Sequence, residues 1–445
     1  MSALASDSMV LAPVSQARGH CQLPGSKSAS IRALLMAAHA KGVTRLSNLL
    51  QSDDTRVMRA ALVALGFEII QAGKEVRVTG ALGPSIRAAS LDVGNSGLSV
   101  RSLVPALAFT RGQFTVAGVP RMHARPIGDL VDALCAIGAS IGYLEEEGYP
   151  PLLIGPQLLQ PRSPVSVAGS ASSQFVTGLL QAAPIWLAGS SAENDIEIDV
   201  RGELISRQYV ALTIDLMGRF GVDVEGDPHA PSAAFLVPAG SRYQSPGEFL
   251  IEGDASSASY FFALGALGGG PVMVEGVAAD SAQPDIGILA VLEAMGATVT
   301  RGKGSISVAS PGVARGFKLN PIDLDLNHMP DGAMTVAALC MFASGPSCIR
   351  NIGSWRVKET DRLAAMAAEL VKFGADIREG RDWLEITPPK VFTAARVATY
   401  DDHRMAMSLS LLACAGVEVT IADPACVNKT FPDYFERFLA LTLAK

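Results

Sequence analysis

Apolar and polar residues follow a repeating pattern along the chain. A helix with apolar periodicity ends in glycine five times, at Gly66, Gly138, Gly221, Gly296 and Gly374, and a short strand-like run follows each. Glycine is the usual stop just after the last helical turn, because it adopts positive φ without strain. The spacings of 72, 83, 75 and 78 residues predict a repeated unit of ~75 residues.

A second kind of helix alternates with the first. It opens on a small polar residue and is apolar nearly all round, which is typical of a fully buried helix. Its candidates begin near Ser28, Asn95, Ser172, Asp254, Asp331 and Asp401. The two patterns together predict six units in globular lobes. If the N-termini of these helices converge, their unpaired N–H groups would bind an anion.

The composition narrows the class of function. The 445 residues are too many for one core, and the net charge of −7 argues against non-specific nucleic-acid binding. No apolar run reaches the roughly 18 residues of a spanning helix, and the N-terminus has no signal-peptide pattern. Six cysteines without a CxxC pair and scattered histidines predict a reduced, cytoplasmic protein without a metal site.

The densest charge lies in the segment from Trp355 to Arg362, where five of eight residues are charged, against 18% in the whole chain. On a helix, Lys358, Glu359 and Arg362 would share a face. Two cations and a carboxylate at a helix start suit an anionic substrate that also needs a proton moved. A solvated ion-pair turn is the alternative.

Other segments place cations and hydroxyls at helix starts. The Gly25–Ser28 segment resembles a P-loop only superficially, since no glycine directly precedes Lys27, and a nucleotidase is therefore poorly supported. Lys27 and Arg32 could still hold a phosphate there. The alternative for this segment is a capped helix on which Lys27 and Arg32 are surface cations.

The chain carries, in order, the motifs LPGSKS, RPIGDLVDAL, SSQF, EGDASSASYF, RVKETDR, DDHRMAM and KTFPDYFE. These motifs resemble those of 5-enolpyruvylshikimate-3-phosphate synthases (3-phosphoshikimate 1-carboxyvinyltransferases) of the common bacterial and plant class. The resemblance implies an α/β (α+β) enolpyruvyl transferase fold with two lobes, each built from three βαβαββ units. Lobe I would comprise residues 1–24 and 252–445, and lobe II residues 25–251.

The same resemblance implies transfer of the enolpyruvyl group of phosphoenolpyruvate to the 5-hydroxyl of shikimate 3-phosphate, without a metal or an organic cofactor. Asp331 would be the base near the hydroxyl, and Glu359, supported by His403, would exchange a proton at the methylene carbon. Lys27 would assist proton transfer. The residues matched to shikimate 3-phosphate are Lys27, Ser28, Arg32, Ser172, Ser173, Gln174, Ser206, Tyr209, Asp331, Ser354 and Lys358. Those matched to phosphoenolpyruvate are Lys27, Gly97, Arg125, Gln174, Arg362, Arg404 and Lys429.

The expected partners are therefore small anionic substrates, with no nucleic acid and no membrane, and the expected state is a monomer. A paralogous enolpyruvyl transferase with another acceptor stays an alternative. Transfer to UDP-N-acetylglucosamine is disfavoured because that family usually carries a reactive cysteine in the loop matching Arg121–Pro126, which has none here. A catalytically inactive binding protein is disfavoured because Lys27, Asp331, Glu359 and His403 are all present.

Some positions depart from the family pattern. Leu98 and Ser102 stand where threonine and proline are usual, at positions linked to tolerance of the inhibitor glyphosate. A bulky residue at position 98 should push Gly97 toward the phosphoenolpyruvate subsite, so tolerance is expected. Ile31 and Ser354 stand where asparagine is usual, which leaves the contacts with the acceptor open.

Overall fold

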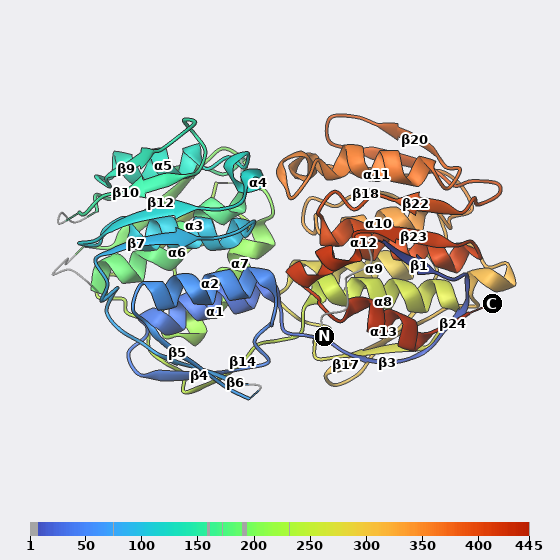
Figure 1. The fold of residues 1–445 in the computed structure, drawn as a ribbon, viewed down its shortest axis with the longest axis horizontal. Coiled ribbons are helices and arrows are strands. Elements are labelled where there is room, and N and C mark those ends of the chain that lie inside the picture. The colour runs from blue at the N-terminus through green and yellow to red at the C-terminus, as the bar shows by residue number, and fades with distance from the viewer. Residues whose placement is uncertain are drawn as a thin grey trace. The chain divides into compact units, whose positions relative to one another are not determined.

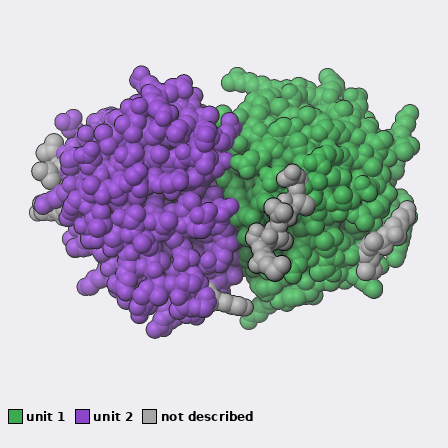
Figure 2. Space-filling view, viewed as in Figure 1, with its two compact units in different colours: residues 1–24, 253–445 green, residues 25–252 purple. Residues whose placement is uncertain are grey.

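The computed structural model describes residues 8–73, 75–157, 161–170, 172–188, 194–230 and 232–444. The chain divides into two compact units, shown in green and purple in Figure 2. Unit 1 comprises residues 1–24 and 253–445, and unit 2 comprises residues 25–252. The second boundary lies one residue after the expected one. Unit 2 is therefore one continuous stretch, whereas unit 1 is made from two.

The described residues of unit 2 form three sheets. Across each sheet, in the order given below, the first two strands pair in parallel and every further pair is antiparallel. The first sheet has the order β14 (Glu248–Leu250), β4 (Val43–Ser47), β6 (Glu75–Thr79) and β5 (Glu68–Ala72). The second has the order β7 (Ala88–Asp92), β8 (Gln113–Ala117), β10 (Leu152–Ile154) and β9 (Ile141–Tyr143). The third has the order β11 (Val165–Ala168), β12 (Ile196–Arg201) and β13 (Ala234–Val237).

Unit 1 also contains three sheets, together with the strand pair β2 (Val14–Ala17) and β24 (Thr442–Ala444). One sheet has the order β16 (Thr298–Arg301), β17 (Ser305–Ala309), β15 (Val272–Glu275) and β3 (Gly19–Gln22). Another has the order β18 (Asp323–Asp325), β19 (Ser347–Arg350), β21 (Leu384–Thr387) and β20 (Asp376–Glu379). The last has the order β1 (Ser8–Leu11), β23 (Val419–Ala422) and β22 (Ala395–Val397).

Helices connect these strands in the expected βαβαββ order, most completely in β18-α10-β19-α11-β20-β21 and in β7-α3-β8-α5-β9-β10, where the short α4 precedes α5. The order β3-α8-β15-α9-β16-β17 is the same, but the whole of unit 2 is inserted between β3 and α8. The helices of unit 2 are α1 (Lys27–His39), α2 (Asp53–Ala64), α3 (Gly97–Leu107), α4 (Pro120–His123), α5 (Gly128–Ala136), α6 (Ser173–Ala188) and α7 (Arg207–Arg219). Those of unit 1 are α8 (Ala255–Gly268), α9 (Ile288–Ala294), α10 (Ala333–Cys340), α11 (Arg362–Val371), α12 (His403–Ser410) and α13 (Tyr434–Leu441). The predicted fold class is confirmed.

Unit 1 also contains short 3₁₀ helices: η1 (Pro284–Gly287), η2 (Val313–Arg315), η3 (Gly353–Val357), η4 (Leu411–Ala415) and η5 (Pro424–Lys429). The first sheet of unit 2 is completed by β14, the last strand of that unit in the sequence, which pairs with β4. In unit 1, the N-terminal strand β1 completes the sheet of β22 and β23.

Each unit has buried helices at its centre: α1, α3 and α6 in unit 2, and α8, α10 and α12 in unit 1 (Figure 1). All six begin within two residues of the predicted positions. Within unit 2, α3 and α6 approach so closely that a Cβ added to Gly178 would lie 2.1 Å from the Arg101 carbonyl oxygen. Only glycine fits at this position. The other helix pattern is confirmed too, since all five glycines that stop a helix have positive φ, from 76° to 110°.

Two features, membrane-spanning helices and groups of metal-binding side chains, are absent from the described residues. None of the helices that the structure describes is long and apolar enough to cross a membrane. Within the same ranges, no group of three or more His, Cys, Asp or Glu side chains is arranged to hold a metal ion. The six cysteines are all free thiols, and five of them are buried.

Candidate functional site

In unit 1, charged residues gather where three helices begin. Asp331 lies just before α10, Arg362 is the first residue of α11, and Asp402 caps α12 by accepting the backbone N–H of Arg404 at 2.9 Å. The first-turn N–H groups of a helix lack partners within it and carry partial positive charge, which favours carboxylates at these positions. The helix starts thus bring together residues from distant parts of the sequence.

Arg362 holds this cluster together, and only 1% of its side chain is exposed. Its Nε donates to Asp402 at 2.7 Å, and its Nη1 donates to Asp331 at 2.8 Å. Its Nη2 donates to Glu359 at 2.9 Å and to Asp402 at 3.3 Å. Burial would lower the pKa of Arg362, but the three carboxylates raise it above its ordinary value. These bonds use most of its five N–H groups, so its contact with phosphoenolpyruvate stays a prediction.

Asp331 has cations on several sides. Arg404 Nη2 donates to it at 3.0 Å, and Lys358 Nζ lies 3.8 Å from Oδ1. Arg404 also donates through Nη1 to the hydroxyl oxygen of Tyr260 at 3.2 Å. Burial raises the pKa of Asp331, but Arg404, Lys358 and Arg362 outweigh burial and hold that pKa well below its ordinary value. Asp331 is therefore ionised, and it would become a stronger base if an anionic ligand drew these cations away.

The structure corrects one prediction about this cluster. Lys358 and Glu359 do not share a helical face with Arg362, because α11 begins only at Arg362. The helix starts there because Asp361 is its N-cap and accepts the N–H of Ala364 at 3.1 Å, while Lys358 has extended backbone. The side chains meet all the same, since Glu359 reaches Arg362 from the turn before the helix.

A fourth carboxylate, Asp285 in η1, was missed by the sequence analysis. It is 2% exposed, accepts the N–H of Gly332 at 2.9 Å, and accepts a hydrogen bond from the Ser256 hydroxyl. Burial and then the nearby charge of Asp331 raise the pKa of Asp285 to about 6. Because Gly332 follows Asp331 directly, Asp285 fixes the backbone that carries Asp331. A single carboxylate in a Gln-Pro-Asp turn gives no local signal of such a role.

His403 and Lys429 lie beside the start of α12. His403 is fully buried, and its Nδ1 lies 3.5 Å from Oδ1 of Asp402. Lys429 is the last residue of η5, which packs against α12. Burial raises the pKa of Asp401, and the charge of Lys429 opposes that shift. The proposed support of Glu359 by His403 stays a prediction.

Ser354 lies in η3, beside the fully buried Trp355. The indole N–H of Trp355 donates to the carbonyl of Pro330 at 2.6 Å, which ties η3 to the residue before Asp331. The segment that carries Ser354 is therefore anchored next to the cluster, although the contact of Ser354 with an acceptor stays a prediction.

In unit 2, Arg32 is buried in neutral surroundings. Its Nε donates to the hydroxyl of Thr213 at 2.8 Å, and its Nη1 donates to the carbonyl of Ser28 at 3.0 Å. Burial lowers the pKa of Arg32 to about 10, and Tyr209 opposes that shift. No carboxylate forms an ion pair with Arg32 in the part of the chain that the structure describes. An anionic ligand would supply the missing charge.

Lys27 is the first residue of α1, which Ser26 caps by accepting the N–H of Ala29 at 3.4 Å. The Lys27 ammonium lies 3.6 Å from Oδ2 of Asp54, and both side chains are largely buried. Asp54, in the first turn of α2, was not predicted, because its proximity to Lys27 arises from the packing of α1 against α2.

Gly97, Arg125 and Gln174 meet in unit 2, as three residues matched to one ligand should. Arg125 Nη1 donates to the carbonyl of Asn95 at 3.0 Å, and Arg101 Nη1 donates to Gln174 Oε1 at 2.8 Å. A Cβ on Gly97 would lie 2.4 Å from Arg125 Nη2 and 2.8 Å from Arg101 Nη1, so a side chain there would displace both guanidinium groups. Arg101 was missed, and its signal was a lone arginine in an otherwise uncharged, fully buried helix.

The remaining unit 2 candidates lie at the starts of α6 and α7. The Ser172 hydroxyl accepts the N–H of Gln174 at 3.2 Å, and Ser173 is the buried first residue of α6. Ser206 precedes α7 with a φ of 50°, and Tyr209 lies in the first turn of that helix. A serine in this left-handed conformation is uncommon and is often found at functional sites. The contacts of these residues with an acceptor stay predictions.

Three comparisons with known proteins agree. The family model described as EPSP synthase (3-phosphoshikimate 1-carboxyvinyltransferase) matches residues 11–438. The chain is 54% identical over 440 residues to the 3-phosphoshikimate 1-carboxyvinyltransferase of Burkholderia orbicola, which covers 98% of this chain and 100% of that protein. It is 54% identical over 435 residues to the enzyme of the same name from Paraburkholderia phymatum, with 97% and 98% covered.

Solved structures share the fold. The EPSP synthase of Acinetobacter baumannii has a TM-score of 0.78 and 24% identity, with 98% of both chains covered. The enolpyruvyl transferase NikO of Streptomyces tendae has a TM-score of 0.74 and 19% identity, with 98% and 97% covered. At such identities the likeness shows the architecture alone.

Proposed function

This chain belongs to the EPSP synthase (3-phosphoshikimate 1-carboxyvinyltransferase) family, and we propose that it transfers the enolpyruvyl group of phosphoenolpyruvate to the 5-hydroxyl of shikimate 3-phosphate. The hydroxyl loses its proton and its oxygen bonds to C2 of phosphoenolpyruvate, while C3 gains a proton. The resulting ketal then loses the C3 proton and the phosphate. The products are 5-enolpyruvylshikimate 3-phosphate and phosphate.

The observation that carries the proposal is the buried cluster of Asp331, Glu359 and Arg362. The reaction needs one group that takes the hydroxyl proton and one that gives and later removes a proton at C3. Asp331 and Glu359 supply two carboxylates, and Arg362 holds each of them through a different nitrogen at 2.8 and 2.9 Å. We assign the hydroxyl proton to Asp331 and the C3 proton to Glu359.

Unit 2 contributes groups that bind anions. Phosphate and carboxylate groups are recognised by arginine through paired N–H donors. Arg125 is 4% exposed, and its Nε has no hydrogen-bond partner among the described residues, so this buried donor remains for a ligand. Arg125, Lys27 and Gln174 are assigned to phosphoenolpyruvate, and Arg32 with Ser28 to shikimate 3-phosphate.

The proposal places the enzyme in the cytoplasm as a monomer that acts on small anions. Six free cysteines support a reducing compartment, because structural disulfides form in oxidising ones. A negative net charge of −7 supports substrates bound by local cations rather than by a basic surface.

The test is phosphate release by the purified chain supplied with phosphoenolpyruvate and shikimate 3-phosphate, with the enol ether product identified by NMR. Release that requires both compounds is the expected result. Release that does not depend on shikimate 3-phosphate, or that is faster with UDP-N-acetylglucosamine as the acceptor, would contradict the proposal. Glu359→Gln should abolish most turnover, whereas the matched control Glu293→Gln, at an exposed ion pair with Arg301, should leave it unchanged.

A further inference from the structure

Unit 1 contains a cavity of about 540 Å³ that none of the proposed catalytic or substrate-binding residues lines. Its walls come from η2, from the segment after α10, from the end of β21 and from η4. This volume lies within the usual range for pockets that bind small molecules.

The cavity lies at the far ends of two helices that serve the candidate site. Asp331 precedes α10, and the cavity-lining Met341 directly follows the last residue of that helix. Arg404 lies in the first turn of α12, and the cavity-lining Cys414 lies in η4, which continues from it. Since α10 has eight residues, it separates the two places by about 12 Å. The cavity is therefore separate from the site of the proposed reaction.

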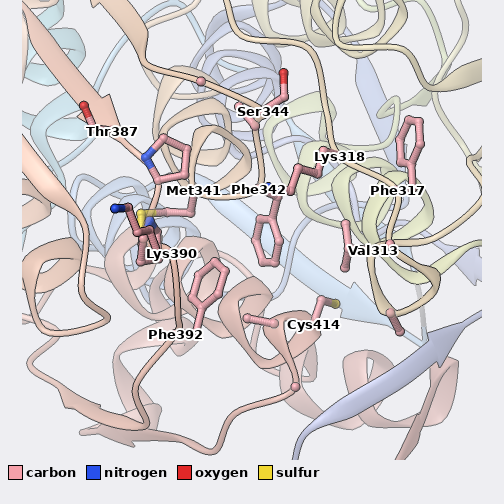
Figure 3. A pocket seen from close by; sticks show the side chains of 18 of the residues that line it. Val313, Phe317, Lys318, Met341, Phe342, Ser344, Thr387, Lys390, Phe392 and Cys414 are labelled. Carbon is pink, nitrogen blue, oxygen red and sulfur yellow. The ribbon is translucent and has the colours of Figure 1, made fainter.

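The walls of the cavity are mainly apolar and include a pair of aromatic rings. Phe342 and Phe392 stack with centroids 5.4 Å apart and an angle of 28° between their planes. Figure 3 shows these rings with Met341 and Val313 also pointing into the cavity. Burial raises the pKa of Cys414 to about 12, so its thiol stays neutral and adds to the apolar wall. Aromatic rings favour a planar apolar ligand, which they contact by stacking or by edge-to-face packing.

The charged residues of the lining all have one sign. Lys318 and Lys390 line the cavity, and no aspartate or glutamate among the described residues does, although the chain carries a net charge of −7. Figure 3 shows the two lysines on either side of Phe342 in this view. Neither lysine forms an ion pair within the ranges that the structure describes. Two ammonium groups beside an apolar cavity complement an anionic group on an apolar ligand.

The wall that carries Phe342 is fixed by backbone hydrogen bonds. The Leu319 N–H donates to the Phe342 carbonyl at 3.0 Å, and the Ser344 N–H donates to the Leu319 carbonyl at 2.8 Å. A wall that is already ordered loses little conformational freedom when a ligand binds.

We propose that this cavity is a second ligand site, which binds a small aromatic carboxylate. The ring lies against Phe342 and Phe392, and the carboxylate lies between the ammonium groups of Lys318 and Lys390. This site does not depend on the proposed transferase activity, because it shares no residue with the proposed catalytic or substrate-binding set.

The test is calorimetric titration of the full chain with 3-phenylpropionate, in buffer containing phosphate to occupy the anion-binding residues of the proposed active site. A ligand of this size is expected to bind one site with a Kd on the order of 1 mM. The neutral 3-phenylpropionamide and the double variant Lys318→Met/Lys390→Met should each weaken binding by about tenfold, because a charge-assisted contact is lost.

Two further variants sharpen the test. Ser344 is exposed at the cavity, so Ser344→Trp should fill it and abolish binding without disturbing the core. Lys303→Met, at an exposed lysine outside the lining, should leave binding unchanged. The proposal is wrong if no saturable binding occurs, if the amide binds as well as the acid, or if the double lysine variant or Ser344→Trp binds like the parent chain. None of these measurements requires phosphate release, so the failure of one proposal is distinguishable from the failure of the other.

Discussion

Arg362 in unit 1 and Arg32 in unit 2 are both 1% exposed, but they have opposite surroundings. Arg362 donates to three carboxylates, which raise its pKa. Arg32 donates to a hydroxyl and a carbonyl, and burial lowers its pKa to about 10. The charge of Arg362 is therefore balanced by the protein itself, whereas no carboxylate among the described residues pairs with Arg32.

This difference suggests a division of work between the two units. In unit 1, the carboxylates Asp331, Glu359, Asp402 and Asp285 lie among the cations, so the cluster is assembled without a ligand and supplies the carboxylates of the proposed proton transfers. In unit 2, the described ion pairs place only Asp54 beside the candidate cations. An excess of buried positive charge is costly to fold but strengthens the binding of a phosphate or a carboxylate.

The largest expected effect is on stability. Arg362→Met takes the paired guanidinium from Glu359 and Asp402 and removes one of the three cations around Asp331, which should destabilise unit 1 by about 3–5 kcal/mol. Arg32→Met removes an unbalanced buried charge and should change the stability of unit 2 by no more than about 1 kcal/mol. Hydrogen exchange resolved for each unit measures both changes. Equal losses of stability in the two variants would show that the charges of Arg362 and Arg32 are balanced to the same extent.

The next effect is on turnover. Asp331→Asn and Glu359→Gln should each lower kcat by about 10²–10⁴-fold with little change in the KM for shikimate 3-phosphate, since they remove proton-transfer groups. Ser28→Ala in unit 2 should instead raise that KM, by about tenfold, and leave kcat nearly unchanged. Steady-state kinetics with both substrates separates the two outcomes. A kcat effect for Ser28→Ala, or a pure KM effect for the carboxylates, would contradict the division of work.

A smaller effect concerns the proposed phosphoenolpyruvate subsite of unit 2. The resemblance to the family implies that glyphosate inhibits the enzyme by binding there. The double variant Leu98→Thr/Ser102→Pro should bind glyphosate about tenfold more tightly, because a smaller residue at 98 leaves Gly97 more room. Its stability should fall by about 3 kcal/mol, since proline inside α3 removes a helical N–H and the hydrogen bond from the Ser102 hydroxyl to Gln181 Oε1 at 3.1 Å is lost.

The single variant Leu98→Thr keeps the bond between Ser102 and Gln181. It should therefore gain sensitivity to glyphosate without the loss of stability. Inhibition competitive with phosphoenolpyruvate, measured alongside denaturant unfolding, tests both expectations. Unchanged inhibition constants in both variants would show that position 98 does not control the subsite.

The smallest expected effect is the pH dependence of stability at Asp285. A carboxyl whose pKa rises to about 6 on folding keeps its proton in the folded state at pH values where the unfolded chain has lost it. The stability of the parent chain should therefore fall as pH rises from about 4 to about 6, and this contribution should stay constant above that window.

Asp285→Asn removes this titration and should keep the hydrogen bond from the Gly332 N–H. It should be more stable than the parent chain at neutral pH by about 1 kcal/mol, and the difference should vanish near pH 4. Denaturant unfolding between pH 4 and 8 measures it, with Asp280→Asn as a control at an exposed position. A difference that does not vary with pH would show that Asp285 is ionised in the folded chain at all these values.

The features that the sequence predicted correctly have local causes. A glycine such as Gly296 or Gly374 stops a helix through its own backbone freedom, and a helix such as α8 reveals its burial through its own composition. The features that it missed depend on the folded arrangement. Asp285 in η1 accepts a hydrogen bond from the Gly332 N–H, and Asp54 lies near Lys27 because α2 packs against α1. Both contacts join residues that are distant in the sequence.

Lys358 and Glu359 show a limit of another kind. Their spacing to Arg362 fits a helix, but in the structure Asp361 is the N-cap, and the helix begins only after it. The side chains still gather, since Lys358 lies near Asp331 and Glu359 pairs with Arg362, although no helical face brings them together.

The division of unit 1 into two separate stretches has a consequence for synthesis on the ribosome. Unit 2 is complete once residue 252 has emerged, but β3 of unit 1 must wait for β15, its parallel partner, from the second stretch. At about 5–20 residues per second, residues 253–445 take roughly 10–40 s to be made. A nascent chain stalled once residue 252 has emerged from the ribosome should thus carry a folded unit 2 behind an unpaired N-terminal strand, whose exposed edge is open to chaperones or to a neighbouring chain.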